Sequence, residues 1–171
     1  LIAQALIPPA TPFVVLRHGK ALKRAAWDGP DIERPLDHAG QEQAESLVPL
    51  LGTYGITHVH SSAATRCLRT VEPYARSIGT SVVPEAALSE EGFADDPVAG
   101  LERAAQLLAA SGRNRVPTVL CGHRPVMPAT LAHLLKDSDV VGPTGTIPAG
   151  SFVVLHVDDG LVVADEQHLL E

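Results

Sequence analysis

Short apolar runs recur along the chain, and polar segments rich in glycine and proline separate them. Four runs have the length of strands, at 13–16, 56–62, 81–84 and 116–121. Continuous runs of this kind are typical of strands that are buried on both faces of a parallel sheet. A fifth region, 151–167, is apolar on both sides of Asp159-Gly160, which predicts a β-hairpin with these two residues as its turn.

Apolar residues at helical spacing lie between the predicted strands. Ala44, Leu47, Val48 and Leu51 follow an i, i+3, i+4, i+7 pattern, which predicts a helix over 40–51 with Asp37 as its cap. Further helices are predicted over 63–78, from 97 to about 110, and after 125. The last of these helices has four apolar side chains on one side. These four are Met127, Leu131, Leu134 and Leu135.

Prolines, glycines and polar runs predict where these helices stop. Pro73 predicts a kink or break in the second helix, and Gly112 predicts the end of the third. Loops are predicted over 19–36, over the acidic segment 85–96 and over the Gly/Pro-rich segment 137–150.

Strands that alternate with helices predict a three-layer α/β fold. Its mainly parallel sheet is flanked by helices, and the terminal hairpin adds an antiparallel edge. A length of 171 residues suits one domain. Residues 1–11 open on Leu1, are apolar and proline-rich, and lack the basic start of a signal peptide. We interpret 1–11 as the remnant of an interdomain linker in a longer protein and 12–171 as the domain.

Composition narrows the function. The chain is 45% hydrophobic and 19% charged, so it can bury a core. A net charge of −7 argues against binding to nucleic-acid polymers or to anionic membranes. The two cysteines, Cys67 and Cys121, lack metal-ligand spacing, and nothing supports a disulfide between them, so a reducing, cytoplasmic setting is predicted.

Two predicted strands end in the same kinds of residue. The first ends in Arg17-His18-Gly19 and the fourth in Gly122-His123-Arg124. In open α/β sheets, ligands bind beyond the carboxyl ends of the strands, so both histidines are expected at one crevice. Arg66, in the first turns of the following helix, is expected to point to the same edge. Arginine binds phosphoryl oxygens in pairs, which makes this a predicted phosphoryl pocket.

The same residues suggest a reaction. The neutral imidazole of His18 could attack phosphorus and hold the phosphoryl group, while the arginines stabilise its charge. Glu90 and Glu91 in the acidic segment are candidates for the proton donor to the leaving oxygen. No metal site and no cofactor are predicted, because arginine and histidine already meet the phosphoryl charge and the acidic residues lack EF-hand spacing.

Five segments together resemble the histidine phosphatase superfamily, which has the phosphoglycerate-mutase-like fold. They are "LRHGKA", "RPLDHAGQEQA", "SSAATRCLRT", "LSEEGF" and "CGHRP", in this order. The resemblance implies a nucleophile at His18, phosphate arginines at Arg17 and Arg66, a second histidine at His123 and Glu90 rather than Glu91 as the acid. Lys20 departs from the acidic or amide residue of many relatives, which leaves the substrate open.

The short chain and the "RHGKA" form resemble the SixA-like branch. With its proline-rich start, the sequence also resembles the C-terminal domain of mycobacterial MutT-type proteins, which join a Nudix domain to a histidine phosphatase domain and sanitise 8-oxoguanine nucleotides. No Nudix box, Gly-x5-Glu-x7-Arg-Glu, is found in this chain. The resemblance therefore implies a Nudix domain as a partner in the full-length protein and a small phosphorylated molecule such as a nucleotide as substrate.

Six further residues are candidates for substrate contact because they flank the predicted site. They are Gly19, Lys20, Arg24, Ser62, Arg69 and Arg124. Ser62 is also expected to cap the helix that follows it. Two other functions stay open for the same residues: a docking module that binds phosphate or nucleotide for a Nudix domain, and a protein phosphohistidine phosphatase.

Overall fold

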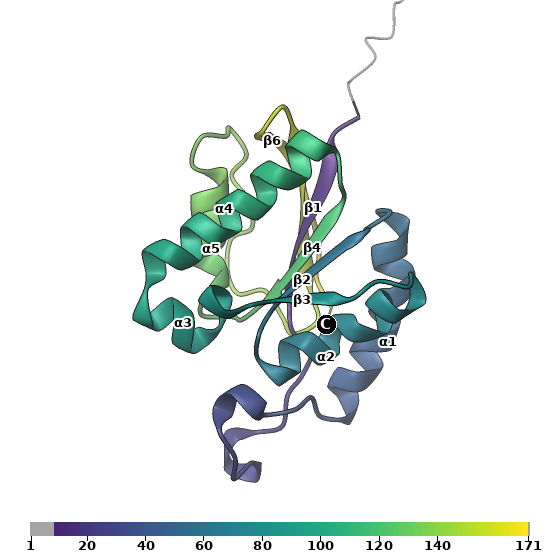
Figure 1. Ribbon diagram of the computed structural model, residues 1–171, viewed down its shortest axis with the longest axis vertical. Helices are drawn as coiled ribbons and strands as arrows, with labels where there is room; N and C mark the ends of the chain where they lie inside the picture. The colour runs from purple at the N-terminus through teal and green to yellow at the C-terminus, as the bar shows by residue number, and fades with distance from the viewer. Residues whose placement is uncertain (1–8, 171) are drawn as a thin grey trace, which may run out of the picture.

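Strands and helices alternate through residues 9–170, the part of the chain that this computed structural model describes (Figure 1). The strands are β1 (Thr11–Arg17), β2 (His58–Ser62), β3 (Val82–Glu85), β4 (Thr118–Gly122), β5 (Phe152–Asp158) and β6 (Leu161–His168). The α-helices are α1 (His38–Thr53), α2 (Thr65–Ser77), α3 (Glu90–Asp95), α4 (Pro97–Asn114) and α5 (Met127–Leu135). Single turns of 3₁₀-helix form η1 (Arg24–Ala26), η2 (Asp31–Glu33) and η3 (Ala86–Leu88).

The strands form one sheet in the order β3-β2-β4-β1-β5-β6. The first four in this order are parallel, whereas β5 runs antiparallel to β1 and β6 antiparallel to β5. The register pairs Arg17 of β1 with Gly122 of β4, and Ser61 of β2 with Cys121. The carboxyl ends of these three strands therefore lie side by side. The prediction of a mainly parallel sheet with a C-terminal antiparallel hairpin is confirmed.

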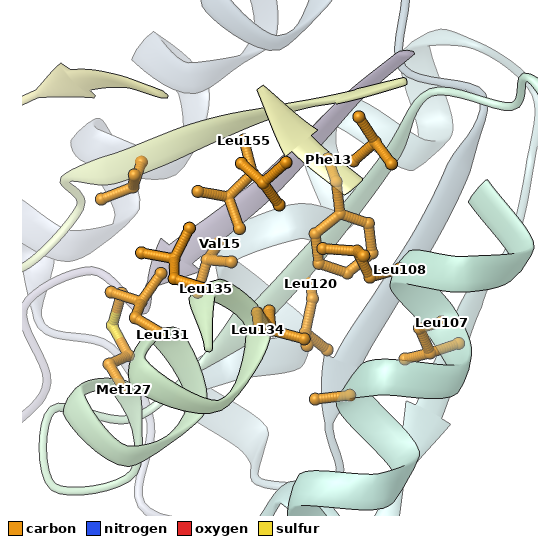
Figure 2. Close-up of a cluster of buried hydrophobic side chains, with 14 of the residues drawn as sticks. Phe13, Val15, Leu107, Leu108, Leu120, Met127, Leu131, Leu134, Leu135 and Leu155 are labelled. Carbon is orange, nitrogen blue, oxygen red and sulfur yellow. The ribbon is translucent and has the colours of Figure 1, made fainter. Parts of the chain in front are cut away.

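The apolar run of β1 is continuous because both of its faces are buried. Phe13 and Val15 pack in one cluster with residues of α4 and α5, which Figure 2 shows in close-up. Val14 and Leu16 pack on the opposite face with residues of α1 and α2. Each such side chain contributes roughly 1.5–3 kcal/mol through its burial. The three-layer architecture predicted from the sequence is thus confirmed, with α4 and α5 on one face and α1 and α2 on the other (Figure 1).

The second helix has about the predicted extent, but a break at Pro73 and a stop of the third helix at Gly112 are both wrong. Helix α2 continues through Pro73, since the turn after it is held by the buried Tyr74, whose hydroxyl donates to the Ile56 carbonyl at 2.6 Å. Helix α4 continues past Gly112, because this glycine lets the helix approach Val157, whose Cγ1 would lie 2.8 Å from an added Cβ. The α4 helix ends instead at Asn114, and the next residue, Arg115, is its C-cap in the left-handed conformation with φ 53°.

The acidic segment 85–96 is not the loop that its polarity predicts. It contains η3 and α3, and Ser89 caps α3 by accepting a hydrogen bond from the Gly92 N–H at 2.9 Å. Such a cap satisfies one of the free N–H groups of a helix start, which lets a short helix form among acidic residues. Glu90 consequently occupies the first position of a helix.

Other boundaries differ less. Strand β1 begins at Thr11, two residues before the predicted run, and residues 1–8 of the predicted linker lie outside the described residues. Segment 19–36 contains η1 and η2, whereas 137–150 forms no helix or strand, as predicted. Asp37 caps α1 as predicted, by accepting a hydrogen bond from the Gly40 N–H at 2.8 Å, and the helix runs on to Thr53.

None of the helices in the described part of the chain is long and apolar enough to cross a membrane.

Candidate active site

The turn after β1 is fixed by hydrogen bonds from three consecutive backbone N–H groups. Those of His18 and Gly19 donate to the Gly122 carbonyl at 3.1 Å and to the Thr70 hydroxyl at 3.0 Å. The third, that of Lys20, donates to Gln43 Oε1 at 2.8 Å. Strand β4 and helices α1 and α2 therefore all hold the segment that carries His18.

Two glycines allow this turn to lie directly against the start of α1. A Cβ on Gly19 would lie 2.9 Å from the Gly40 carbonyl oxygen, and a Cβ on Gly40 would lie 1.9 Å from the Lys20 carbonyl oxygen. The second distance is far below any van der Waals contact with backbone. Glycine is therefore required at both positions by close approach.

The side chain of His18 is buried and oriented by its own turn. Its Nδ1 lies 2.7 Å from the Gly19 carbonyl oxygen. A carbonyl oxygen can only accept, so Nδ1 carries the proton and Nε2 of the neutral ring keeps a lone pair. Burial lowers the pKa of His18, and the neighbouring charges of His123 and Arg66 lower it further, against opposing effects of Cys67 and the Gly19 carbonyl. Neutral His18 thus presents an unprotonated Nε2.

The pKa of the second histidine is shifted in the opposite direction. His123 follows β4, is fully buried, and its ring centroid lies 5.4 Å from that of His18. Its Nδ1 lies 3.2 Å from Glu90 Oε1 and its Nε2 lies 2.7 Å from the Ser62 hydroxyl. Burial disfavours its charge, but hydrogen bonds with Cys67 and Glu90 outweigh burial and raise the pKa of His123 to about 9.

Arg66 of α2 is completely buried and joins three segments. Its Nη1 donates to the Asp31 backbone carbonyl at 2.7 Å, and its Nη2 donates to Asp31 Oδ2 at 3.1 Å and to Glu90 Oε1 at 3.0 Å. The Nε atoms of both Arg66 and Arg17 are buried and have no hydrogen-bond partner among the described residues. Buried donors without partners are rare, and two of them on arginines beside His18 are what an oxyanion site requires.

Glu90 and Glu91 occupy different environments, although they are neighbours in sequence. Glu90 faces inward from the first turn of α3, and its hydrogen bond with His123, helped by Arg66, outweighs burial and lowers its pKa to about 2. Glu91 is exposed. The structure therefore brings Glu90, and not Glu91, to the two histidines.

Comparison with known proteins agrees with this geometry. The family model of the histidine phosphatase superfamily (branch 1) matches residues 13–104, more than half of the chain. The chain belongs to the histidine phosphatase superfamily. As a member, it is a hydrolase of phosphate monoesters.

Individual histidine phosphatases resemble the chain to different degrees. It is 37% identical over 153 residues to an 8-oxo-(d)GTP phosphatase of Mycolicibacterium smegmatis; the match takes in 89% of this chain but only 46% of that protein. The fold of the protein histidine phosphatase SixA, solved with tungstate, superposes with a TM-score of 0.71 at 21% identity, over 92% of this chain and 96% of SixA. A mycobacterial glucosyl-3-phosphoglycerate phosphatase, solved with VO3, gives 0.68 at 19% identity, over 95% and 99%.

Two residues of this histidine phosphatase site were missed by the sequence analysis as contacts. The Asp31 carboxylate, on η2, accepts hydrogen bonds from Arg66 and, at 2.8 Å, from Arg34 Nε. Burial alone would raise the pKa of Asp31, but Arg34 and Arg66, together with Arg24, outweigh burial and lower it. Cys67 of α2 places its sulfur 3.5 Å from His123 Nε2. Neither carries a local sequence signal, since Asp31 lies in a segment predicted only as loop and Cys67 is one apolar helix position among several.

The remaining candidates are divided between the site and its surroundings. Arg24, on η1, lies at the rim, 3.6 Å from Asp31 and 3.7 Å from Glu90, with its side chain 68% exposed. Lys20 is exposed and contributes its backbone N–H. Arg69 is not brought to the cluster: it is exposed and pairs with Glu72 at 2.6 Å.

Ser62 was predicted to cap a helix, and both Ser62 and Arg124 were predicted to contact the substrate. The Ser62 hydroxyl accepts from the Ala64 N–H at 3.3 Å, before the first turn of α2, so it does not cap the helix, contrary to the prediction. Arg124 is exposed. The pKa of Arg17 is lowered mainly by the burial of Arg17 itself, and the nearby charge of Arg124 lowers it further.

Both cysteines are free. In residues 9–170 no three His, Cys, Asp or Glu side chains are grouped so as to hold a metal ion.

Proposed function

We propose that this chain hydrolyses phosphomonoesters through a phosphohistidine on His18. The observation that carries the proposal is the different environment of two adjacent buried histidines. His18 donates from Nδ1 to the Gly19 carbonyl and leaves Nε2 free, and burial lowers its pKa, whereas contacts with Cys67 and Glu90 raise the pKa of His123 to about 9. Environments that push the pKa values of neighbouring groups apart are how enzymes assign a nucleophile and a charge stabiliser. Arg17 and Arg66, each with an unpartnered buried Nε, supply donors for the phosphoryl oxygens.

The first step transfers the phosphoryl group to the protein. The Nε2 lone pair of His18 forms a bond to phosphorus, and the bond between phosphorus and the ester oxygen breaks. The leaving oxygen takes a proton from Glu90. In the second step, water attacks the phosphohistidine, Glu90 accepts its proton, the N–P bond breaks and phosphate leaves.

Glu90 must be protonated for the first step, yet its pKa is about 2 in the absence of substrate. Its carboxylate accepts the hydrogen bonds of Arg66 and His123 that a phosphoryl oxygen would accept. A bound phosphoryl dianion competes for both donors and repels the carboxylate charge, and both effects raise the Glu90 pKa. Substrate binding thus converts a structural carboxylate into a proton donor.

The substrate class and the setting follow from the longer relative. We propose a nucleotide substrate, because the Mycolicibacterium smegmatis relative, 37% identical, is an 8-oxo-(d)GTP phosphatase. The chain spans about half of that protein. We propose that a Nudix domain is its partner in the full-length protein, as the resemblance of the sequence to MutT-type proteins implies. Two free, buried cysteines are consistent with the cytoplasmic location that we propose. No metal is required in this scheme, since Arg17, Arg66 and His123 meet the phosphoryl charge.

The test is phosphate release by the purified chain in the presence of EDTA. The substrates are an aryl phosphate, GDP, 8-oxo-GDP and GTP, and the variants are His18→Ala and, as matched control, His38→Ala, whose side chain is 87% exposed. We expect release that survives EDTA, is lost in His18→Ala and is retained in His38→Ala. Normal rates in His18→Ala refute the phosphohistidine route. Saturable phosphate binding without any product, in folded protein, identifies a docking module instead.

A further inference from the structure

A hollow of about 410 Å³ lies between α5 and the loop 137–150. Met127, Leu131 and Leu135, which Figure 2 shows along one side of α5, line it together with Val140 and Ile147. Val141, which also lines it, is 87% exposed. The volume is in the range of small-molecule sites, which are mostly apolar with a few polar groups.

The hollow adjoins the phosphoryl site through two arginines. Arg17 Nη1 donates to the backbone carbonyl of Ile147 at 2.6 Å, so one wall of the hollow is bonded to a residue that flanks His18. Arg124, directly after His123, is the one charged residue among those of 9–170 that line the hollow, and its charge acts on Arg17. A molecule held by its phosphoryl group at His18 therefore has this hollow as a neighbour.

The lining indicates which chemistry fits. It is largely hydrocarbon, with Thr146 as the hydroxyl and the exposed Arg124 guanidinium as the charge. Guanidinium groups stack on flat rings, and apolar walls favour ring systems that shed water. With only one hydroxyl and one guanidinium among its side chains, the lining suits the apolar faces of a flat ring better than a strongly hydrated group.

We propose that this hollow binds a flat ring at the far end of the leaving group of the ester that is cleaved at His18. The inference rests on the proposed function and adds its selectivity: esters that carry such a ring are preferred over esters of the same alcohol type without one. Recognition then resides in α5 and the loop 137–150, apart from the groups that transfer phosphate.

The experiment compares phenylalkyl phosphates, with linkers of one to four carbons, with the corresponding alkyl phosphates. All are esters of primary alcohols of similar acidity, so the ratio of kcat/KM reports the ring alone. We expect one linker length for which the ring raises kcat/KM about tenfold, as apolar contacts in a pocket typically do. In Ala132→Phe, which fills the hollow from α5, this ratio falls to about one, while turnover of the alkyl phosphates is kept.

The matched control is Ala129→Phe, the same change on an exposed position of α5 that does not line the hollow. It should keep the preference. A preference that is absent from the wild type, or that survives Ala132→Phe, or a uniform loss on all substrates in that variant, overturns the inference. Absence of turnover on every ester, in the wild type as well, refutes the proposed function instead, so the two failures are distinguishable.

Discussion

Replacing Glu90 by glutamine tests the electrostatics of the site. The change keeps the shape of the side chain but removes the charge that lies 3.0 Å from Arg66 Nη2 and 3.2 Å from His123 Nδ1. Both partners are completely buried, whereas the Glu90 side chain is 27% exposed. A buried cation that loses its partner is costly, so Glu90→Gln should destabilise the fold as well as the reaction.

The magnitude follows from the pKa of Glu90. Its value falls from 4.5 to about 2 on folding, mainly through the hydrogen bond with His123. A difference of this size corresponds to about 3 kcal/mol of stability at neutral pH. The pKa of His123 rises from 6.5 to about 9 against the effect of burial, through hydrogen bonds with Cys67 and with Glu90, so the Glu90 contact enters both shifts and they are not added. Since Glu90 is in part exposed, we expect about 2–3 kcal/mol.

The sign of the pH dependence is fixed by the lowered pKa of Glu90. The contribution of ionised Glu90 to the free energy of unfolding is fully present above 4.5, its pKa in the unfolded chain. This contribution is lost as the pH falls towards 2, its pKa in the folded chain. Urea unfolding of wild type and Glu90→Gln should therefore differ by about 2–3 kcal/mol at pH 7, and the difference should shrink steadily below pH 4.5. Other carboxylates titrate in both proteins and cancel. An equal difference at pH 7 and pH 2.5, or none at pH 7, refutes the ionic account.

The matched control is Glu91→Gln, one residue further along α3 and exposed. It should leave the free energy of unfolding within about 0.5 kcal/mol of wild type, as surface substitutions do. NMR titration gives a second readout: the pKa of His123 should fall below about 9 in Glu90→Gln, which keeps the contact with Cys67, and should not change in Glu91→Gln. A His123 pKa unaffected by Glu90→Gln would assign its charge to other neighbours.

Two further predictions test the turn and the second histidine. Gly40→Ala should destabilise the chain by about 1–3 kcal/mol in urea unfolding, because the new Cβ meets the Lys20 carbonyl oxygen. Gly52→Ala, in the same helix, is the control: an added Cβ there has nothing within 4 Å and should stabilise the chain by up to about 1 kcal/mol. Equal effects of the two variants would contradict the close approach at Gly40. Inhibition by inorganic phosphate should weaken as the pH rises through about 9, because His123 then loses its proton; inhibition that stays constant from pH 7 to 10 would remove His123 from phosphate binding.

Much of the fold could be predicted because its signals are local. The apolar run of β1 needs only neighbouring residues to specify a strand buried on both faces. The turn between β5 and β6 could be predicted at Asp159-Gly160 because Asp and Gly tolerate the positive φ that such turns need. In the structure the two residues have φ of 46° and 80°. The position of Arg17 at the end of β1 and of His18 directly after it follows from the same pattern and from the general placement of ligands in α/β sheets.

The errors in the helices have a common cause. Pro73 and Gly112 are local stop signals, and packing of the sheet-facing side of each helix outweighed them. Segment 85–96 was predicted as loop from its charge, but the Ser89 cap sufficed for a short helix once η3 and α4 were packed against it.

The sequence by itself determined the parallel sheet and the chemistry at the ends of β1 and β4, because strand patterns and the residues that follow them are contiguous in the chain. The tertiary structure alone decided the pairing of charges. Arg66 meets Asp31 and Glu90, which are 35 and 24 residues away in the chain, and selects Glu90 over Glu91. It also placed Arg69 outside the site. Such pairs depend on how separate segments pack, and the energy of an ion pair depends on distance and burial, which only the packed chain defines.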